Sequence, residues 1–523
     1  MRRTLRTILA IARADFRERR RRYAYLVALA LTCWLGWLSS EGTLRVELGP
    51  WRGVLDAAWI GGSLAIIAST FLSLFGGWLV RGTIARDSAT GVGEILATTP
   101  LTGRAYLLGK WLSHAVYLSS LALILALLAV FMLARNAEAA GFDLARLWLP
   151  MLLVALPSLA FAAGLAVAFE VLPVFRTSFG NVAWLFVWAI VFTLSLEVSS
   201  ALDFSGLGAT RASLRADLVA SQGVDETAFR VGGGPRRATQ SFVWHGFDWT
   251  PGFVASRLAW VGIGAILAIA AAPLFDRFDP SRRRLRSLAA ATRGKAALGA
   301  LASDLLAPFD REPLPVGPVR PVAAAQALPA APRGPSFAAL VRGQLRFALR
   351  GRARLFWAGA LALGVASFNA TVAEAPPVAL AYLWPILLWS RLGAPDTAVA
   401  PVLAACPRPV GRPLLAAFVG GALLGSLFVA GAILRAALSG HAAGLAAALV
   451  AIAFPPALAL MLGAWSGSPR PFEALYTCLW YVGVQTPTLD FMGATPAPNL
   501  LPFAAAVPLL LAAAAVGRAR ALR

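Results

Sequence analysis

The sequence predicts an all-α polytopic membrane protein with about 12 transmembrane helices in two parallel six-helix repeats. Hydrophobic residues make up 59% of the chain and charged residues only 14%, against roughly 25% charged in soluble proteins. Several apolar runs exceed the ~18 residues that cross a bilayer. Basic residues gather just outside these runs, where they set the topology and meet anionic lipid head groups.

The net charge of +22 does not indicate nucleic acid as a partner, because the basic residues border apolar runs. The three cysteines are scattered and have no spacing typical of a metal site. The sequence has no GxxxxGK[ST] phosphate-binding loop, no HExxH and no GxSxG. We therefore expect no enzyme activity, cofactor or metal, and any ATP hydrolysis would occur on a separate chain.

Residues 1–22 are expected to form an amphipathic helix in the membrane interface. Their apolar residues recur at helical spacing and share one face: Leu5, Ile8, Leu9, Ala12 and Phe16. The alternative is a disordered basic tail, and the apolar stripe favours the helix. The run from Tyr23 to Leu38 lacks a small-residue cleavage site, so we interpret it as a retained first span and not as a signal peptide.

Residues 23–275 are predicted to form the first six-span transmembrane domain. Hydropathy places its spans at about 23–39, 57–80, 107–134, 147–170, 180–200 and 253–275. The segment 201–252 is expected to be an extracytoplasmic loop with a short helix over 209–222. Its aromatic run from Phe242 to Phe253 is interpreted as interfacial anchoring, with a substrate-contacting lip as the alternative.

Residues 276–335 are predicted to be a cytoplasmic linker rich in Pro and Arg. Residues 336–523 then form the second six-span domain. Its spans are expected at about 355–373, 376–392, 413–437, 443–465, 473–489 and 500–517. The basic C-terminal tail and the even number of spans place both termini in the cytoplasm, in the plasma (bacterial inner) membrane.

The polar stretch from Arg86 to Lys110 interrupts two long apolar runs and carries basic residues at both ends. Basic flanks indicate the cytoplasmic side. Asp87 or Ser88 can cap the start of a short helix, and Pro100 can end it. Gly91 would lie inside this helix, where close approach by another backbone is one use for a glycine.

This stretch resembles the first cytoplasmic loop of ABC-2 type transporter permeases. The resemblance rests on an ordered set of residues: Asp87, Gly91, Glu94, Ile95, Leu96, Thr98, Pro100, Arg104 and Lys110. In that family the loop is a coupling helix that docks on a separate ATP-hydrolysing subunit. The resemblance therefore implies an exporter permease, with ATP-binding-cassette subunits as a dimeric partner and membrane lipid around it. Asp87 departs from the pattern, because a Glu is more usual there.

The second half contains a counterpart of this loop, as expected for an internal repeat. Leu96 corresponds to Leu403, Pro100 to Pro407, and Arg104 to Arg412 after one inserted residue. Asp396 is the only acidic residue of this counterpart, and Pro401 stands where the first loop has Glu94. We therefore expect the two loops to dock asymmetrically, with the stronger contact made by the first.

Two alternatives to an ABC-2 permease remain: an ion-coupled secondary transporter, and a non-transporting membrane scaffold or lipid-modifying enzyme. An ion-coupled carrier needs ionisable residues inside its spans. Glu170 lies near a predicted span end and is interpreted as a snorkelling or capping residue, and His114 as an interfacial one. The sequence offers neither the mid-membrane carboxylate nor the carboxylate–histidine pair expected of an ion-coupled carrier, and no polar cluster typical of a lipid-modifying enzyme.

Overall fold

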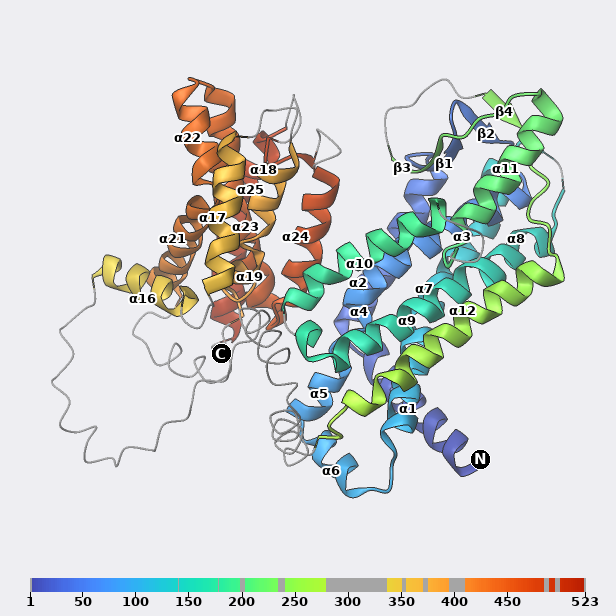
Figure 1. Ribbon diagram of the computed structural model, residues 1–523, viewed down its shortest axis with the longest axis horizontal. Coiled ribbons are helices and arrows are strands. Elements are labelled where there is room, and N and C mark those ends of the chain that lie inside the picture. Colours follow the sequence, from blue (N-terminus) through green and yellow to red (C-terminus); the bar gives the residue numbers. More distant parts are fainter. Residues whose placement is uncertain are drawn as a thin grey trace, which may run out of the picture. The chain divides into compact units, whose positions relative to one another are not determined.

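The computed structural model describes most of the chain, and helices dominate it (Figure 1). The described residues are 2–139, 141–176, 178–197, 203–233, 240–278, 336–349, 354–369, 375–394, 410–483, 489–493 and 499–521. They fall into two units. The first comprises Met1–Arg176 with Ala183–Leu288, and the second Thr177–Val182 with Ala289–Arg523.

Residues 2–278 form a series of mostly apolar helices. In chain order these are α1 (Arg2–Arg20), α2 (Tyr23–Ser40), α3 (Ala57–Ile67), η1 (Ala68–Leu72), α4 (Ser73–Val80), α5 (Thr83–Ala89), α6 (Val92–Thr98), α7 (Gly103–Asn136), α8 (Leu144–Pro150), η2 (Met151–Ala155), α9 (Leu156–Val171), η3 (Pro173–Arg176), α10 (Ser178–Glu197), α11 (Leu207–Gln222), α12 (Pro251–Ala270) and η4 (Ala272–Leu274). The π-helical turn η1 connects α3 to α4 without a break, and η2 connects α8 to α9 in the same way. Each of these two segments is therefore one long continuous helix.

Helices connected by short turns make up most of the described residues of the second unit. Its helices are α16 (Phe337–Leu349), α17 (Arg354–Asn369), α18 (Ala375–Leu383), α19 (Ile386–Trp389), α21 (Gly411–Phe428), α22 (Ala430–Leu438), α23 (Ala442–Ser466), α24 (Arg470–Gly483) and α25 (Leu501–Ala521). One of its cores packs Leu414 and Ala417 of α21 against Leu460 of α23 and Ala514 of α25. The Trp389 indole also donates to the Gly421 carbonyl at 2.8 Å.

Nine helices among the described residues are long and apolar enough to cross a membrane. They span Tyr23–Ser40, Ala57–Ala89, Gly103–Asn136, Leu144–Val171, Phe179–Leu196, Pro251–Leu274, Gly411–Phe428, Ala442–Ser466 and Leu501–Ala521. Six of them coincide with the six ranges predicted within 23–275. The helical class is thus confirmed, and several of its helices are long and apolar enough to cross a membrane, whereas the count of about 12 spans stays a prediction.

The all-α prediction was wrong in one region, which we call the sheet cap (β1 to β4 with α11). Its strands are β1 (Leu44–Leu48), β2 (Trp51–Gly53), β3 (Phe229–Gly233) and β4 (Gln240–Phe242), in the order β3-β1-β2-β4. β1 pairs antiparallel with β2 and β3, and β2 pairs parallel with β4. Only Gly49 and Pro50 separate β1 from β2, but β3 and β4 lie far from both in the sequence, and the strands are short, so no local pattern indicated the sheet.

The aromatic run after β4 packs into the core of the sheet cap. Phe242 and Trp244 are each 2% exposed, and the Trp244 ring meets Trp59 of α3 edge-on at 5.9 Å between centroids. The Trp244 indole donates to Ser213 of α11 at 3.0 Å. These buried aromatic side chains therefore fix the cap to α3, and for Phe242 and Trp244 the interpretation as membrane anchors or as a substrate lip was wrong. Trp249 and Phe253 are only partly buried, and for them that interpretation stays a prediction. The predicted short helix is confirmed as α11.

α9 and α12 pack with their backbones in contact. A Cβ added to Gly264 would lie 2.6 Å from the Ala160 carbonyl oxygen, and one added to Gly164 would lie 2.1 Å from that of Gly264. Small residues allow such close packing in membrane helices. A side chain at either position would force the two helices apart.

We predict that Gly264→Leu destabilises the protein by about 3 kcal/mol, because overpacking a close helix contact forces backbone shifts. Gly262→Leu is the matched control, since Gly262 lies on the same helix and nothing lies within 4 Å of its added Cβ. The measurement is thermal unfolding in detergent micelles. Equal shifts of the unfolding temperature in the two variants would contradict this packing.

Candidate functional site

The two short helices α5 and α6 connect α4 to α7, and together with residues 81–102 we call them the α5–α6 loop. The loop and α1 lie at one end of the first unit, and the sheet cap lies at the other (Figure 1). Asp87 lies within α5 and does not cap a helix start. α6 ends at Thr98, as expected from Pro100 two residues later.

Gly91 joins α5 to α6 in a left-handed conformation, with φ at 75°. Nothing lies within 4 Å of a Cβ added there. The prediction that Gly91 sits inside a helix and admits another backbone was therefore wrong. Its role is to turn the chain between two helices, because only glycine adopts a positive φ at little cost.

Glu170 of α9 holds the start of α5. Its carboxylate accepts from the backbone amides of Gly82 at 2.6 Å and Ile84 at 2.9 Å. Amides at a helix start have no partner within the helix and carry partial positive charge, so a carboxylate there is stabilising. The capping role predicted for Glu170 is confirmed, although the helix that it caps is not its own.

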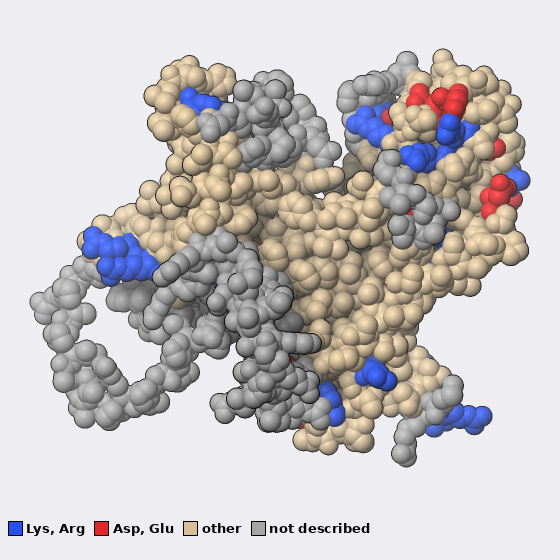
Figure 2. All heavy atoms as spheres, viewed as in Figure 1, with Lys and Arg blue, Asp and Glu red and all other residues tan. Residues whose placement is uncertain are grey.

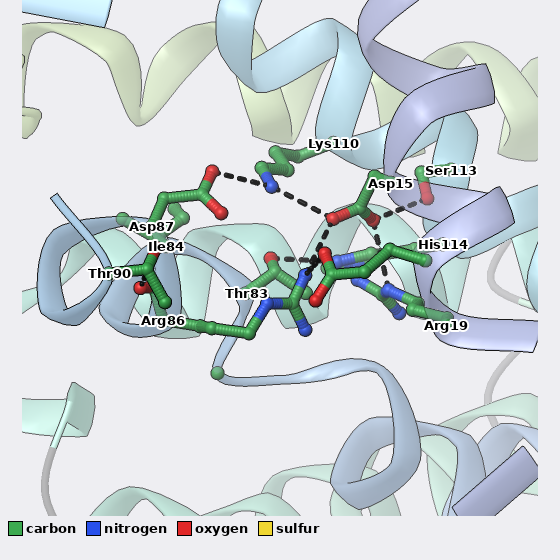
Figure 3. Close-up of polar contacts among 12 residues, drawn as sticks. Asp15, Arg19, Thr83, Ile84, Arg86, Asp87, Thr90, Lys110, Ser113 and His114 are labelled. Atoms are coloured by element: carbon green, nitrogen blue, oxygen red, sulfur yellow. Dashed lines mark hydrogen bonds and ion pairs between the residues drawn. The ribbon is translucent and has the colours of Figure 1, made fainter. Parts of the chain in front are cut away.

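A buried charge cluster links the α5–α6 loop to α1 and α7 (Figure 3). We define it as Asp15, Arg19, Arg86, Asp87 and Lys110. Asp15 is at its centre, 2.9 Å from the Lys110 ammonium, 3.0 Å from the Arg86 guanidinium and 2.9 Å from that of Arg19. Lys110 also contacts Asp87 at 2.7 Å. The cluster therefore ties three helices together through ion pairs.

The charge cluster is screened from solvent, which strengthens its interactions. The side chains of Asp15, Arg19 and Lys110 are each 5% exposed or less. Burial alone would raise the pKa of Asp15, but Arg19 and Lys110 outweigh it and hold that pKa well below its ordinary value of 3.8. Ser113 adds a hydrogen bond to the same carboxylate at 2.5 Å. Asp15 is therefore an ionised carboxylate in a structural role.

An aromatic clasp packs beneath the loop, formed by Tyr106, Phe275 and Phe278. The Tyr106 hydroxyl donates to Asp87 at 2.6 Å, and its ring stacks on Phe275 at 5.1 Å between centroids. Phe278 meets both rings edge-on. The segment that follows α12 is thus packed against the loop.

Two residues of this segment have an unusual backbone. Arg277 and Phe278 have φ values of 52° and 63°, which cost non-glycine residues roughly 1–2 kcal/mol each. Such a conformation persists only where its surroundings fix it. Arg277 donates to the Thr99 carbonyl at 3.2 Å, and Phe278 lies against Gly93 of α6.

We predict that Gly93→Val displaces Phe278, because the added Cβ would lie 2.5 Å from the Phe278 ring. The expected result is faster tryptic cleavage at Arg277, by about fivefold or more, since the strained segment would lose its support. The double variant Gly93→Val with Phe278→Ala removes the clash and should restore part of the protection. Unchanged cleavage in the single variant would contradict the clasp.

The outer face of the α5–α6 loop is open. Ile95 is 67% exposed and Val92 is 44% exposed. Glu94, Pro100 and Arg104 are exposed as well. The loop thus combines a charged, buried underside with an exposed top, on which Ile95 and Val92 lie among polar residues.

The predicted site residues therefore separate into two groups. Asp87 is buried and Leu96 is partly buried, whereas Glu94, Pro100 and Arg104 point outward. Arg412 is exposed in the first turn of α21. The rest of the second-half counterpart, Asp396, Leu403 and Pro407, lies outside the described residues, as does the predicted linker after Phe278.

Sequence reasoning missed the role of Asp15 and misplaced His114. His114 is fully buried beneath α1 and the loop, with its Nε2 3.4 Å from the Thr83 hydroxyl, so the interfacial prediction was wrong. The sequence does contain a pattern that indicates the buried role of Asp15. It follows Ile8 and Ala12 at helical spacing, and an acidic residue on the apolar face of a basic helix indicates a buried cationic partner.

Fold and site together define a helical protein, with several helices long and apolar enough to cross a membrane and a braced helical loop at one end of the first unit. Searches with protein-family models, against curated proteins and against solved structures find no match for the chain.

Proposed function

We propose that this chain is the transmembrane permease of an ATP-driven ABC-2 type exporter, and that the α5–α6 loop docks on a separate ATP-binding subunit. The observation that carries the proposal is the two-sided loop. Its top presents Ile95 and Val92 beside Glu94, and its underside is tied to the rest of the unit by Asp87. Protein interfaces commonly have an apolar centre inside a polar rim, and Ile95 and Val92 beside Glu94 fit that arrangement.

The bracing supports a mechanical role for the loop. A partner that moves α6 must also move α5, and α5 is ion-paired through Arg86 and Asp87 to groups on α1 and α7. Removing one partner from a buried ion pair leaves an uncompensated charge and costs about 3–5 kcal/mol. Because separating these pairs is costly, the loop moves together with the helices that it contacts. A ligand-driven change also requires different contacts in the two states, which a docked ATPase would provide on closing.

In this proposal the chain spans the plasma (bacterial inner) membrane about 12 times, with both termini in the cytoplasm. The partner is a dimer of ATP-binding-cassette subunits, and ATP hydrolysis takes place there. The second-half counterpart around Asp396 docks on the other subunit with the weaker contact. Two fused six-span halves would then rock against each other and open a path outward.

The direct test is affinity purification of the tagged chain from its native membranes with a mild detergent. We expect a subunit with a Walker A motif, GxxxxGK[ST], to copurify in a nucleotide-dependent manner. A chain that transports its substrate in purified proteoliposomes with no ATPase present would contradict the proposal.

One observation favours an ion-coupled secondary transporter as a second candidate. The structure gathers the carboxylates of Asp15 and Asp87, the Lys110 ammonium and the His114 imidazole in one buried region. No pattern in the sequence indicated this grouping. The low pKa of Asp15 argues against proton carriage by this residue, because it stays ionised at physiological pH. Transport driven by an ion gradient alone, abolished in Lys110→Met, would favour this candidate.

A further inference from the structure

The outer face of α1 carries a stripe of arginines. They are Arg2, Arg6, Arg13, Arg17 and Arg20, which follow one another at intervals of three, four or seven residues and so share one helix face. All five are exposed, and none has an ion pair within the part of the chain that the structure describes. Figure 2 shows basic side chains at this end of the first unit.

Exposed leucines lie beside the arginine stripe. Leu5 is 59% exposed and Leu9 is 38% exposed, one turn apart on the adjoining face. α2 is an apolar helix long enough to cross a membrane, and only Arg21 and Arg22 separate it from α1. This arrangement suits the boundary between hydrocarbon and water, where leucines enter the acyl region and arginines reach phosphate groups.

The opposite face of α1 is joined to the α5–α6 loop. Arg86 of α5 contacts Asp15 at 3.0 Å and Glu18 at 2.9 Å, so one guanidinium joins the loop to two carboxylates of α1. On the α7 side, Ile11 of α1 lies against Gly109, where an added Cβ would be 2.7 Å away. α1 is thus in contact with the loop on one face while its arginine stripe faces outward.

We propose that the arginine stripe of α1 binds the anionic phospholipids of its membrane leaflet, and that this binding stabilises the α5–α6 loop through Arg86. The lipid binding follows from the charge and the position of α1. Its consequence for coupling rests on the function proposed above. Each arginine at an anionic surface strengthens association about fivefold, and five in one stripe make the lipid dependence steep and sensitive to salt.

The test uses the full chain in lipid nanodiscs and needs no ATPase, so its outcome is separable from the proposed function. One set of nanodiscs contains phosphatidylcholine alone, and the other contains about a third phosphatidylglycerol. Hydrogen–deuterium exchange with mass spectrometry follows α1 and the α5–α6 loop. We expect exchange at both segments to be at least about threefold slower in the anionic nanodiscs.

Two arginine-pair variants decide whether the stripe is responsible. Arg13→Gln with Arg17→Gln should remove most of the lipid effect at both segments. Arg342→Gln with Arg346→Gln is the matched control, an exposed pair at the same spacing on α16, and should leave the effect intact. Loss of the effect in both pairs would assign it to net charge alone and overturn the proposal.

Arg86→Gln separates lipid binding from its transmission. This variant leaves Asp15 paired with Lys110 and Arg19, so α1 keeps its buried contacts. The lipid effect should then persist at α1 and disappear at the loop. Equal exchange in the two lipid compositions for the wild-type chain, or a loop effect that survives Arg86→Gln, would overturn the proposal.

Discussion

Asp15→Asn is expected to destabilise the first unit by about 3–5 kcal/mol, because it leaves the buried Arg19 and Lys110 and the partly buried Arg86 without their shared carboxylate. Lys110 would keep Asp87 as a partner at 2.7 Å, but Arg19 has Asp15 as its only ion-pair partner among the described residues. Thermal unfolding in detergent micelles measures the loss. Hydrogen exchange in α1 should become faster, because α1 loses its ion-pair contact with α7.

Glu18→Gln is the control for this prediction. Glu18 lies one turn after Asp15 and also contacts Arg86, but its side chain is 46% exposed. Exposed ion pairs contribute about 1 kcal/mol or less. A loss in Glu18→Gln as large as that in Asp15→Asn would show that burial does not determine the strength of the charge cluster.

The same cluster sets a pH dependence with a definite sign. The folded state lowers the pKa of Asp15 below its ordinary 3.8, so its stabilisation is fully present above that value and is lost as the pH falls below it. Protection of α1 from exchange should therefore be constant between about pH 5 and pH 8. A loss of protection on mild acidification, near pH 6, would contradict the assignment of Asp15 as the central ionised group.

Ile95→Asp is expected to abolish activation of the partner ATPase while leaving the permease folded. The side chain is 67% exposed, so its replacement has little effect on stability. A desolvated apolar residue at the centre of an interface contributes about 2 kcal/mol or more, which corresponds to at least about a thirtyfold weaker association. The measurement is the ATP hydrolysis rate of the copurified subunits.

Val243→Asp is the matched control, because Val243 is 51% exposed and directly follows β4, at the opposite end of the unit. It should leave ATP hydrolysis unchanged. A decrease of similar size in both variants would point to a general effect of an added charge and not to docking through the α5–α6 loop.

The sequence could predict those parts of the fold that depend on local pattern. Apolar runs fixed the positions of the helices within 23–275, since bilayer thickness sets their length. Pro100 indicated where α6 ends, and the polar stretch between two spans indicated the loop itself. These features need no knowledge of distant residues.

What could not be predicted depends on contacts between residues far apart in the chain. β1 pairs with β3 across most of the first unit, and Asp15 meets Lys110 only after α1 folds back on α7. Lys110 was interpreted as a topology signal because its neighbours in sequence are apolar. Asp87 was expected among the docking residues, and its burial beneath the loop follows from partners on α7, Tyr106 and Lys110.

The central claim is that an ATP-binding subunit docks on the outer face of the α5–α6 loop. A photo-crosslinking amino acid placed at Ile95 in the full chain tests it most directly, with the same residue at Val243 for comparison. The account predicts a nucleotide-dependent crosslink from position 95 to a subunit with a Walker A motif, and none from position 243. A crosslink from position 95 only to lipid, or to no other protein in membranes that carry out transport, would contradict it.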